Sequence, residues 1–268
     1  MEIKTINGLL DKMWTDYVAI NPLAQKIHDL FTSEGEEILN DHIALRTFNH
    51  PRVTIDVIAK PFIEAGYKYG GDYHFVDKKL YAKHYEHPNK DLPKIFISEL
   101  KLQDFSPELQ KTVNELIDQM PAGLEHKFDF TSIGRPWKVA SETYDKLLKE
   151  SDYAAWVAAF GYRPNHFTVF INKLKKFSDI NFLNSYLKEK GIKLNASGGE
   201  VKGSKEVLLE QSSTLANNID VDFTDKKMPV PACYYEFAKR YSMPSGELYS
   251  GFVAASADKI FESTNKGQ

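Results

Sequence analysis

Two segments of this chain share one pattern, and this repeat constrains the fold more than any other feature. The first segment, Asn40 to Thr47, reads NDHIALRT, and the second, Pro164 to Ile171, reads PNHFTVFI. In both, a histidine follows a polar residue, and apolar side chains then alternate with other types. Alternation with period two predicts a half-buried β-strand. The two histidines, His42 and His166, are 124 residues apart.

The elements that follow each strand repeat in the same order. A helical pattern begins near Thr54 in one copy and near Ser178 in the other, with each taken as an N-cap. The helices are predicted to stop at Gly66 and Gly191, which are 125 residues apart. Pro61 predicts a kink or an early end in the first helix. Further β-rich stretches follow, at residues 67–75, 79–85 and 94–100, then at 192–203, at the pair 207–215 and 219–223, and at 231–241.

These repeats predict an α+β fold built from two βαβββ modules that form a cleft. We divide the chain into four segments. Residues 1–36 form an N-terminal helical packing element, 37–103 the first module, 104–160 a helical insert, and 161–268 the second module with a C-terminal tail.

Composition excludes several classes of function. The chain has 268 residues and a formal net charge of −3, which predicts no nucleic acid or anionic membrane as a partner. No run is long enough to span a bilayer, and the N-terminus lacks a signal-peptide core, so we expect a cytoplasmic protein. With Cys233 as its single cysteine, the chain cannot form a thiolate zinc cluster. A metal would therefore need histidine and carboxylate ligands.

The first strand carries the main chemical signal. His42, Ala44 and Arg46 point to one face of the predicted strand, and the aliphatic residues between them point to the other. At roughly 3.3 Å per residue, the histidine and arginine Cα atoms lie about 13 Å apart. This spacing leaves room for a small molecule that is held at both ends. The alternative for Arg46 is a structural ion pair with Asp41 or Glu99.

A third ligand is expected from the last strand of the second module, where Glu236 lies among aromatic residues. The alternative for this carboxylate is a salt bridge to Lys239 or Arg240. Cys233 faces the other way and is expected only to pack. Two histidines and one carboxylate, with the remaining positions open, form the ligand set of non-heme Fe(II) oxygenases.

The chain resembles the 2-oxoadipate dioxygenase/decarboxylase family, once catalogued as a domain of unknown function, within the vicinal oxygen chelate superfamily. The resemblance rests on four motifs: Asn40 to Thr47, Pro164 to Val169, Tyr234 to Tyr241, and the tail Tyr249 to Phe261. The chain departs from larger bacterial members in being much shorter, and in having Ala255 where those have valine.

The resemblance implies a set of site residues and a reaction. His42, His166 and Glu236 match the metal ligands, and Arg46 matches the arginine that binds the far carboxylate of the substrate. Ala255 and Ser256 match positions that line the pocket. The implied cofactor is Fe(II), which Zn, Ni or Mn can replace on purification. The implied reaction uses O2 to convert 2-oxoadipate to 2-hydroxyglutarate and CO2, within lysine catabolism.

Two other functions stay open at this point. Glu99 could be a fourth ligand in a glyoxalase-like isomerase or lyase, which would need no oxygen. The same cleft could also serve a binding protein without turnover. We expect Glu99 to lie near the cleft without binding the metal. His84 could also lie around the metal, but a surface or structural role is favoured for it. The sequence leaves the oligomeric state open.

Overall fold

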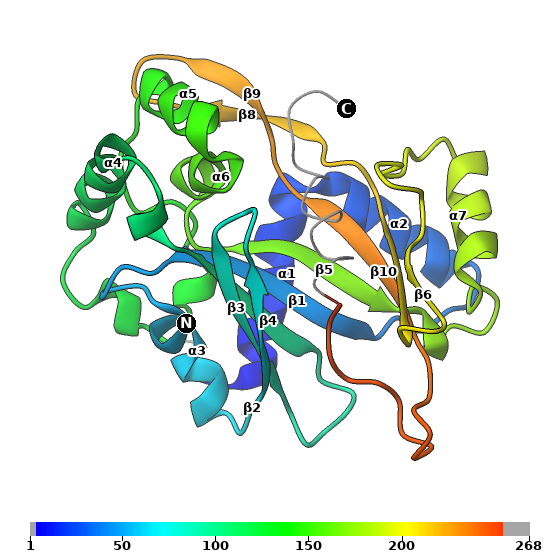
Figure 1. The fold of residues 1–268 in the computed structure, drawn as a ribbon. Helices are drawn as coiled ribbons and strands as arrows, with labels where there is room; N and C mark the ends of the chain where they lie inside the picture. The colour runs from blue at the N-terminus through cyan, green and yellow to red at the C-terminus, as the bar shows by residue number, and fades with distance from the viewer. Residues whose placement is uncertain (1–3, 254–268) are drawn as a thin grey trace.

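The computed structural model describes residues 4–253, so the predicted pocket residues Ala255 and Ser256 lie outside the described residues. Its centre is an eight-stranded sheet with the order β2-β3-β4-β1-β5-β10-β7-β6. These strands are β1 (Asn40–Phe48), β2 (Lys68–Phe75), β3 (Leu80–Glu86), β4 (Lys94–Leu100), β5 (Pro164–Phe170), β6 (Lys202–Ser204), β7 (Leu209–Ser213) and β10 (Tyr234–Arg240). Figure 1 shows that this sheet curls rather than lying flat.

The strand order contains the duplicated pattern. In the first half of the sheet β1 pairs in parallel with β4, and in the second half β5 pairs in parallel with β10. The opening strands β1 and β5 lie side by side and antiparallel in the middle. The α+β fold of two related modules is therefore confirmed, while the residue limits of the four segments stay predictions.

Helices cover the sheet and its ends (Figure 1). They are α1 (Ile6–Ile20), α2 (Pro22–Ser33), α3 (Ile55–Glu64), α4 (Pro107–Asp118), α5 (Ser141–Glu150), α6 (Asp152–Phe160) and α7 (Ile180–Glu189). The N-terminal helices are a packing element, as expected. Trp14 of α1 contacts Phe167 of β5 edge-on, with the ring centres 5.1 Å apart, and also packs against Tyr235 of β10. These strand residues alternate with His166 and Glu236, so α1 covers the face opposite the predicted ligands.

The second module differs from its predicted strand pairing. We expected residues 207–215 and 219–223 to pair with each other. Instead, β7 pairs with β10 and β6, whereas β8 (Asn218–Asp222) pairs with β9 (Lys227–Pro231) in a separate two-stranded sheet. The hairpin is thus inserted before the last strand of the module. Periodicity identifies strands but does not choose their partners, which depend on contacts across the sheet.

Two helix predictions also need correction. The N-cap of α7 is Asp179 rather than Ser178, because the Asp179 carboxylate accepts hydrogen bonds from the amides of Asn181 and Phe182. Pro61 does not end α3 early, because the helix continues to Glu64, while the alternative of a kink at Pro61 stays a prediction. The stops are confirmed: Gly66 and Gly191, just after the two helices, have φ of 102° and 74°, a region that favours glycine.

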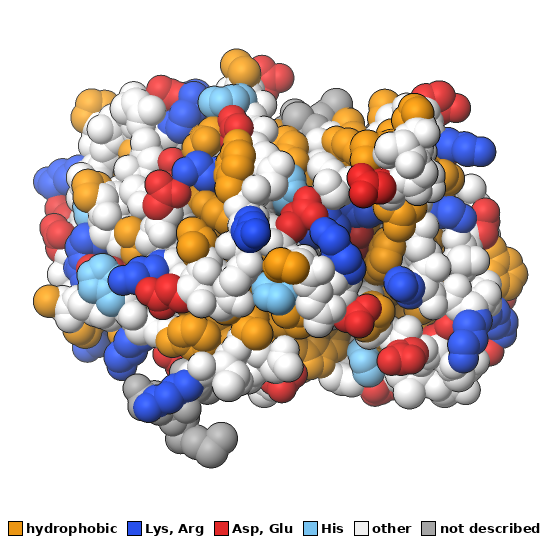
Figure 2. Space-filling model, turned by 90° about the horizontal axis from the view of Figure 1, so that it is seen from below, with side chains coloured by type: hydrophobic (Ala, Val, Ile, Leu, Met, Phe, Trp, Pro, Cys, Tyr) orange, Lys and Arg blue, Asp and Glu red, His pale blue; other side chains and the backbone are white. Residues whose placement is uncertain are grey.

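None of the helices in the described part of the chain is long and apolar enough to cross a membrane. On the face seen in Figure 2, Lys and Arg side chains are interspersed with Asp and Glu, and no continuous basic patch is present there.

Candidate metal centre

The strand register brings three predicted ligands onto one face of the sheet. On neighbouring strands, His42 of β1 is paired with Thr168 of β5, and Thr168 is paired with Glu236 of β10. The next row, two residues away, contains Ala44, His166 and Tyr234. Paired residues on adjacent strands point to the same face. The short side chain of Thr168 thus lies between two longer ones that can approach each other above it.

These three side chains form a compact, buried group. The Nε2 atom of His42 lies 3.5 Å from Oε1 of Glu236, and the Nε2 atom of His166 lies 3.4 Å from Oε2 of the same carboxylate. All three side chains are at most 5% exposed. Within the described residues, this is the group whose histidine and carboxylate atoms, all within 4.8 Å of one another, could hold a metal ion.

Both histidines are oriented by the residue that precedes them. Nδ1 of His42 lies 2.8 Å from Oδ1 of Asp41, and Nδ1 of His166 lies 3.1 Å from Oδ1 of Asn165. When Nδ1 donates to these oxygens, the lone pair of Nε2 faces Glu236 and is available to a metal. A register shift between Asn40 and His42 places one extra residue in β1 at Asp41. Such a bulge changes the direction of a side chain. Here it allows Asp41 and His42, which are adjacent in the sequence, to form a hydrogen bond.

Arg240 pairs with Asp41, and this ion pair determines which partners remain for Glu236. Its guanidinium donates to both carboxylate oxygens of Asp41, at 2.5 and 2.7 Å, and all of these atoms are buried. The expected alternatives therefore do not form: Glu236 has no salt bridge to Arg240, and Asp41 does not pair with Arg46. Lys239 donates to the carbonyl oxygen of Ser178 instead. Glu236 is thus left for the two histidines and for Gln211, which donates to its Oε1 at 2.6 Å.

The protonation of this group fits a metal site. Burial raises the pKa of Glu236 to about 8, although the hydrogen bond that Gln211 donates favours the ionised form. Burial lowers the pKa of His42, and it lowers that of His166 further, with the charges of His42 and Arg46 adding to the effect. Oε2 of Glu236 is buried without a hydrogen-bond partner. A divalent cation would compensate the charge of the buried carboxylate and would bind the lone pairs of the two neutral imidazoles.

The raised pKa of Glu236 predicts how the stability of the metal-free protein depends on pH. Between about pH 6.5 and 8, this carboxyl is ionised in the unfolded chain and protonated in the folded one. The unfolded state then binds fewer protons, so stability falls as pH rises, by up to about 1.4 kcal/mol per unit. The window starts near 6.5 because the histidines act in the opposite direction below that pH. Urea unfolding with a chelator present measures this slope.

Glu236→Gln is the matched variant for that experiment. Its amide does not ionise, so its stability should be nearly constant across the same pH range. An equally steep decline in wild type and variant would show that another group titrates.

Arg46 lies on the same face of β1 as His42, two residues beyond Ala44, and is 4% exposed. In the parallel pairing with β4, its neighbour is Ser98, a small buried residue. The structure therefore places Arg46 on the same face of the sheet as the ligand group, as the strand pattern predicts.

Glu99 lies away from the ligand group, contrary to expectation. It is paired with Thr47, whose side chain points to the face opposite Arg46. There Oε2 of Glu99 accepts a hydrogen bond from the amide of Ile55, at 2.9 Å. This bond replaces the N-cap that we expected from Thr54, whose side chain makes no capping hydrogen bond. Glu99 is thus a helix cap for α3.

Glu99→Gln should leave metal binding intact, because its carboxylate faces away from the ligand group. The amide oxygen of the variant can still accept from Ile55, so stability should change by less than about 1 kcal/mol. Metal content per chain, measured by elemental analysis, checks this. Loss of the metal would instead support the four-ligand site of an isomerase.

His84 approaches the site indirectly. It is buried, bonds to Tyr73 through Nδ1 and to Glu86 through Nε2, and packs against the ring of Phe252. Phe252 in turn contacts His42 edge-on, with the ring centres 4.8 Å apart. Phe252 therefore separates His84 from the predicted ligands.

The segment that contains Phe252 is attached to the site by Arg240. The guanidinium donates to the carbonyl oxygens of Tyr249 and Gly251, at 3.0 and 2.8 Å, and lies over the Phe252 ring. Arg240 thus connects Asp41, which orients His42, to the segment with Phe252, which covers His42. Sequence reasoning missed this role, although the repeated polar residue before each histidine was a visible signal for Asp41 and Asn165.

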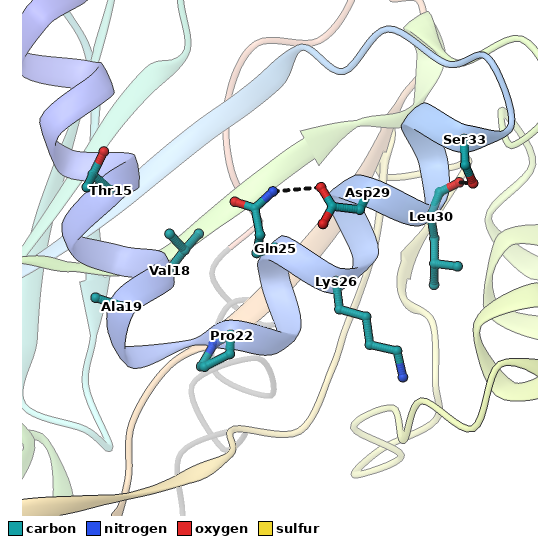
Figure 3. A pocket seen from close by; sticks show the side chains of 9 residues that line it. All are labelled: Thr15, Val18, Ala19, Pro22, Gln25, Lys26, Asp29, Leu30 and Ser33. Carbon is teal, nitrogen blue, oxygen red and sulfur yellow. Dashed lines mark hydrogen bonds between the residues drawn. The ribbon is translucent and has the colours of Figure 1, made fainter.

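A second concavity has different chemistry. The groove between α1 and α2 in Figure 3 has a volume of about 730 Å³ and contains none of the predicted site residues. Its acid, Asp29, accepts a hydrogen bond from Gln25 at 2.8 Å. The groove therefore does not compete with the ligand group as the candidate centre.

Comparisons with known proteins agree with the fold and show the family of the chain. Residues 5–247 match the model of a family described as 2-oxoadipate dioxygenase/decarboxylase. A chloroplastic protein of that name from Arabidopsis thaliana is 34% identical over 288 residues, which cover 97% of this chain and 78% of the relative.

Solved structures show the same similarity. A hydroxyglutarate synthase from Oryza sativa, in complex with 2-oxoadipate, has a TM-score of 0.92 and 33% identity, and the match covers 96% of this chain and 91% of that one. A Shewanella frigidimarina structure with the general name hydrolase has a TM-score of 0.91 and 53% identity, over 95% of this chain and all of that one. A glyoxalase superfamily protein from Ralstonia eutropha, at 20% identity and TM-score 0.77, shares the fold.

Proposed function

Because this chain belongs to the 2-oxoadipate dioxygenase/decarboxylase family, we propose that it converts 2-oxoadipate and O2 to 2-hydroxyglutarate and CO2 with Fe(II) as its metal. The observation that carries the proposal is the buried group of His42, His166 and Glu236 beside an inward-facing arginine. The family name of the relatives supports the reaction class, and the buried group provides the side chains that could bind the metal for this reaction.

The proposed reaction balances without another reductant. The bond between C1 and C2 of 2-oxoadipate breaks, and C1 leaves as CO2. One oxygen atom of O2 enters the new carboxylate at C2, and the other enters the hydroxyl group at the former C3. Both oxygen atoms are thus consumed; two of the four electrons come from the oxidative decarboxylation of the 2-oxo acid, and two come from the C–H bond at the former C3 that is hydroxylated.

The residues present fit a divalent metal, because Glu236 has an unpartnered buried oxygen and both Nε2 atoms face it. We propose that these three residues hold Fe(II) on one side and leave positions for the substrate and oxygen. When bound, Fe(II) supplies the chelation of the 2-oxo acid and the one-electron chemistry that activates O2. Zn, Ni or Mn could replace it during purification.

The surrounding side chains have binding and orienting roles in this proposal. Arg46 would bind the far carboxylate of 2-oxoadipate, since a guanidinium offers a bidentate fork to that group. Asp41 and Asn165 would hold the two imidazoles in the tautomer that presents Nε2. Phe252 would exclude water from the side of His42 that it covers.

The alternative functions have less support. In the described residues the ligand group has three members, and Glu99, the expected fourth ligand of an isomerase, caps a helix on the other face. A binding protein without turnover would not need a buried carboxylate between two histidines, because burial of a neutral side chain costs less free energy.

Oxygen consumption tests the proposed function. Metal-free protein reconstituted anaerobically with Fe(II) should consume one O2 per 2-oxoadipate and release one CO2, with 2-hydroxyglutarate as the organic product. Zn(II) protein should bind 2-oxoadipate without consuming O2. Turnover of 2-oxoadipate without oxygen would overturn the proposal.

A cytoplasmic location and a role in lysine catabolism stay predictions. The two named plant relatives are chloroplastic or amyloplastic proteins.

A further inference from the structure

Two aromatic residues of helix α6 contact the guanidinium group of Arg46. The central carbon of this group lies 5.0 Å from the ring centre of Tyr153 and 5.1 Å from that of Trp156. Because the two residues are three positions apart, they lie on the same side of the helix. Both side chains are buried, at 5% and 3% exposure. The arginine therefore makes two cation–π contacts away from bulk water, where such contacts are strongest.

Both rings are held by hydrogen bonds to strands of the sheet. The Tyr153 hydroxyl donates to the carbonyl oxygen of Ser98 on β4, at 2.7 Å, and accepts from the amide of Thr47 on β1, at 3.0 Å. Nε1 of Trp156 donates to the carbonyl oxygen of Ala232, just before β10, at 2.5 Å. Hydrogen bonds thus attach the two rings to both modules, and we call this pair of rings, which contacts Arg46, the clamp.

Arg46 also borders a second space. A surface cavity of about 600 Å³ reaches from the β2–β3 turn to the start of α6 and has Arg46 and Tyr153 in its lining. The same cavity contains the carboxylates of Asp77, Glu150 and Asp152, together with three lysines. A guanidinium that turned outward would find acidic partners there. The cation–π contacts with Tyr153 and Trp156 would be lost in that movement, so they oppose it.

We propose that Tyr153 and Trp156 are positioning residues that hold Arg46 toward the metal centre and thereby set the preference for a dicarboxylate. The proposal rests on the proposed function, since Arg46 is the group that reads the far carboxylate. A cation–π contact is made by the charge of the guanidinium and takes none of its N–H donors as hydrogen bonds to a lone pair, whereas bidentate binding of a carboxylate uses those donors. The clamp thus fixes the reach of Arg46 without taking its donors.

Equilibrium binding to Zn(II)-loaded protein tests the clamp separately from turnover. Calorimetric titration would compare 2-oxoadipate with 2-oxohexanoate, which lacks the far carboxylate. Trp156→Leu should weaken 2-oxoadipate binding about ten- to thirtyfold and change 2-oxohexanoate binding by less than about twofold. Trp156→Phe keeps an aromatic face and should restore most of the difference in affinity between 2-oxoadipate and 2-oxohexanoate.

A purely structural role would weaken both ligands equally, and that result would overturn the proposal. Trp14→Leu is the matched control, since it removes an indole that packs on the opposite face of the sheet. This variant should leave the ratio of the affinities for 2-oxoadipate and 2-oxohexanoate unchanged. If Trp156→Leu does not fold, Tyr153→Leu against Tyr153→Phe repeats the comparison with the other ring.

A double-mutant cycle gives the sharpest readout. In an Arg46→Ala background, Trp156→Leu should have no further effect on the ratio of the two affinities, because the clamp acts only through Arg46. Additive effects would show that Trp156 acts independently and would contradict the proposal. If wild type binds 2-oxoadipate but never consumes O2, the proposed function fails while the binding comparison still decides the clamp.

Discussion

Replacing His166 with alanine is expected to abolish both metal binding and turnover. His166 is one of three ligands in the proposed site, and an open site has few protein bonds to lose. Residues that only orient a ligand cost about ten- to a hundredfold in metal affinity, so loss of a ligand should cost at least about a hundredfold. Elemental analysis after anaerobic reconstitution, with oxygen uptake on the same sample, measures both effects.

His74→Ala is the control for that substitution. His74 lies on β2 with its side chain 67% exposed, outside the ligand group. This variant should keep full metal content and activity. If His166→Ala also kept its metal and its activity, the proposed centre would be wrong, whatever the family of the chain.

Arg46→Ala should nearly erase the preference for dicarboxylates while leaving the metal bound. Without the guanidinium, the far carboxylate of 2-oxoadipate loses a charge-assisted hydrogen bond in a buried site. Such a bond is worth about 1.5–3 kcal/mol, or roughly ten- to a hundredfold. The measurement is the ratio of kcat/KM for 2-oxoadipate to that for 2-oxohexanoate, in wild type and variant. The ratio should fall by that factor.

Arg46→Lys refines this prediction. An ammonium group retains the charge but cannot reproduce the fork, and it lacks the planar surface that a guanidinium presents to Tyr153 and Trp156. Its ratio should therefore fall between those of wild type and Arg46→Ala. An unchanged ratio in Arg46→Ala would mean that another group reads the far carboxylate, and the substrate of the relatives should then not be assigned to this chain.

Local pattern in the sequence was enough for the architecture and for the central residues of the site. The repeat around His42 and His166 predicts the two modules, and alternation predicts that His42 and Arg46 share a face. Both follow from the period of a strand, which depends only on the residues within it. The same local logic places Glu236 on a strand and predicts the glycine stops of two helices.

Only the tertiary structure decided which groups meet across strands. The pairing of Thr47 with Glu99 turns that acid away from the ligand group, and the pairing of β7 with β10 leaves β8 and β9 as a separate hairpin. The bond between Asp41 and Arg240 joins residues 199 positions apart, and the clamp on Arg46 comes from a helix that we expected only to separate two modules. The strand β1 is buried on both faces rather than one. Sequence period reports the direction of each side chain, but its partners depend on strand order, register and the helices packed above the sheet, which are set by long-range burial and hydrogen bonding.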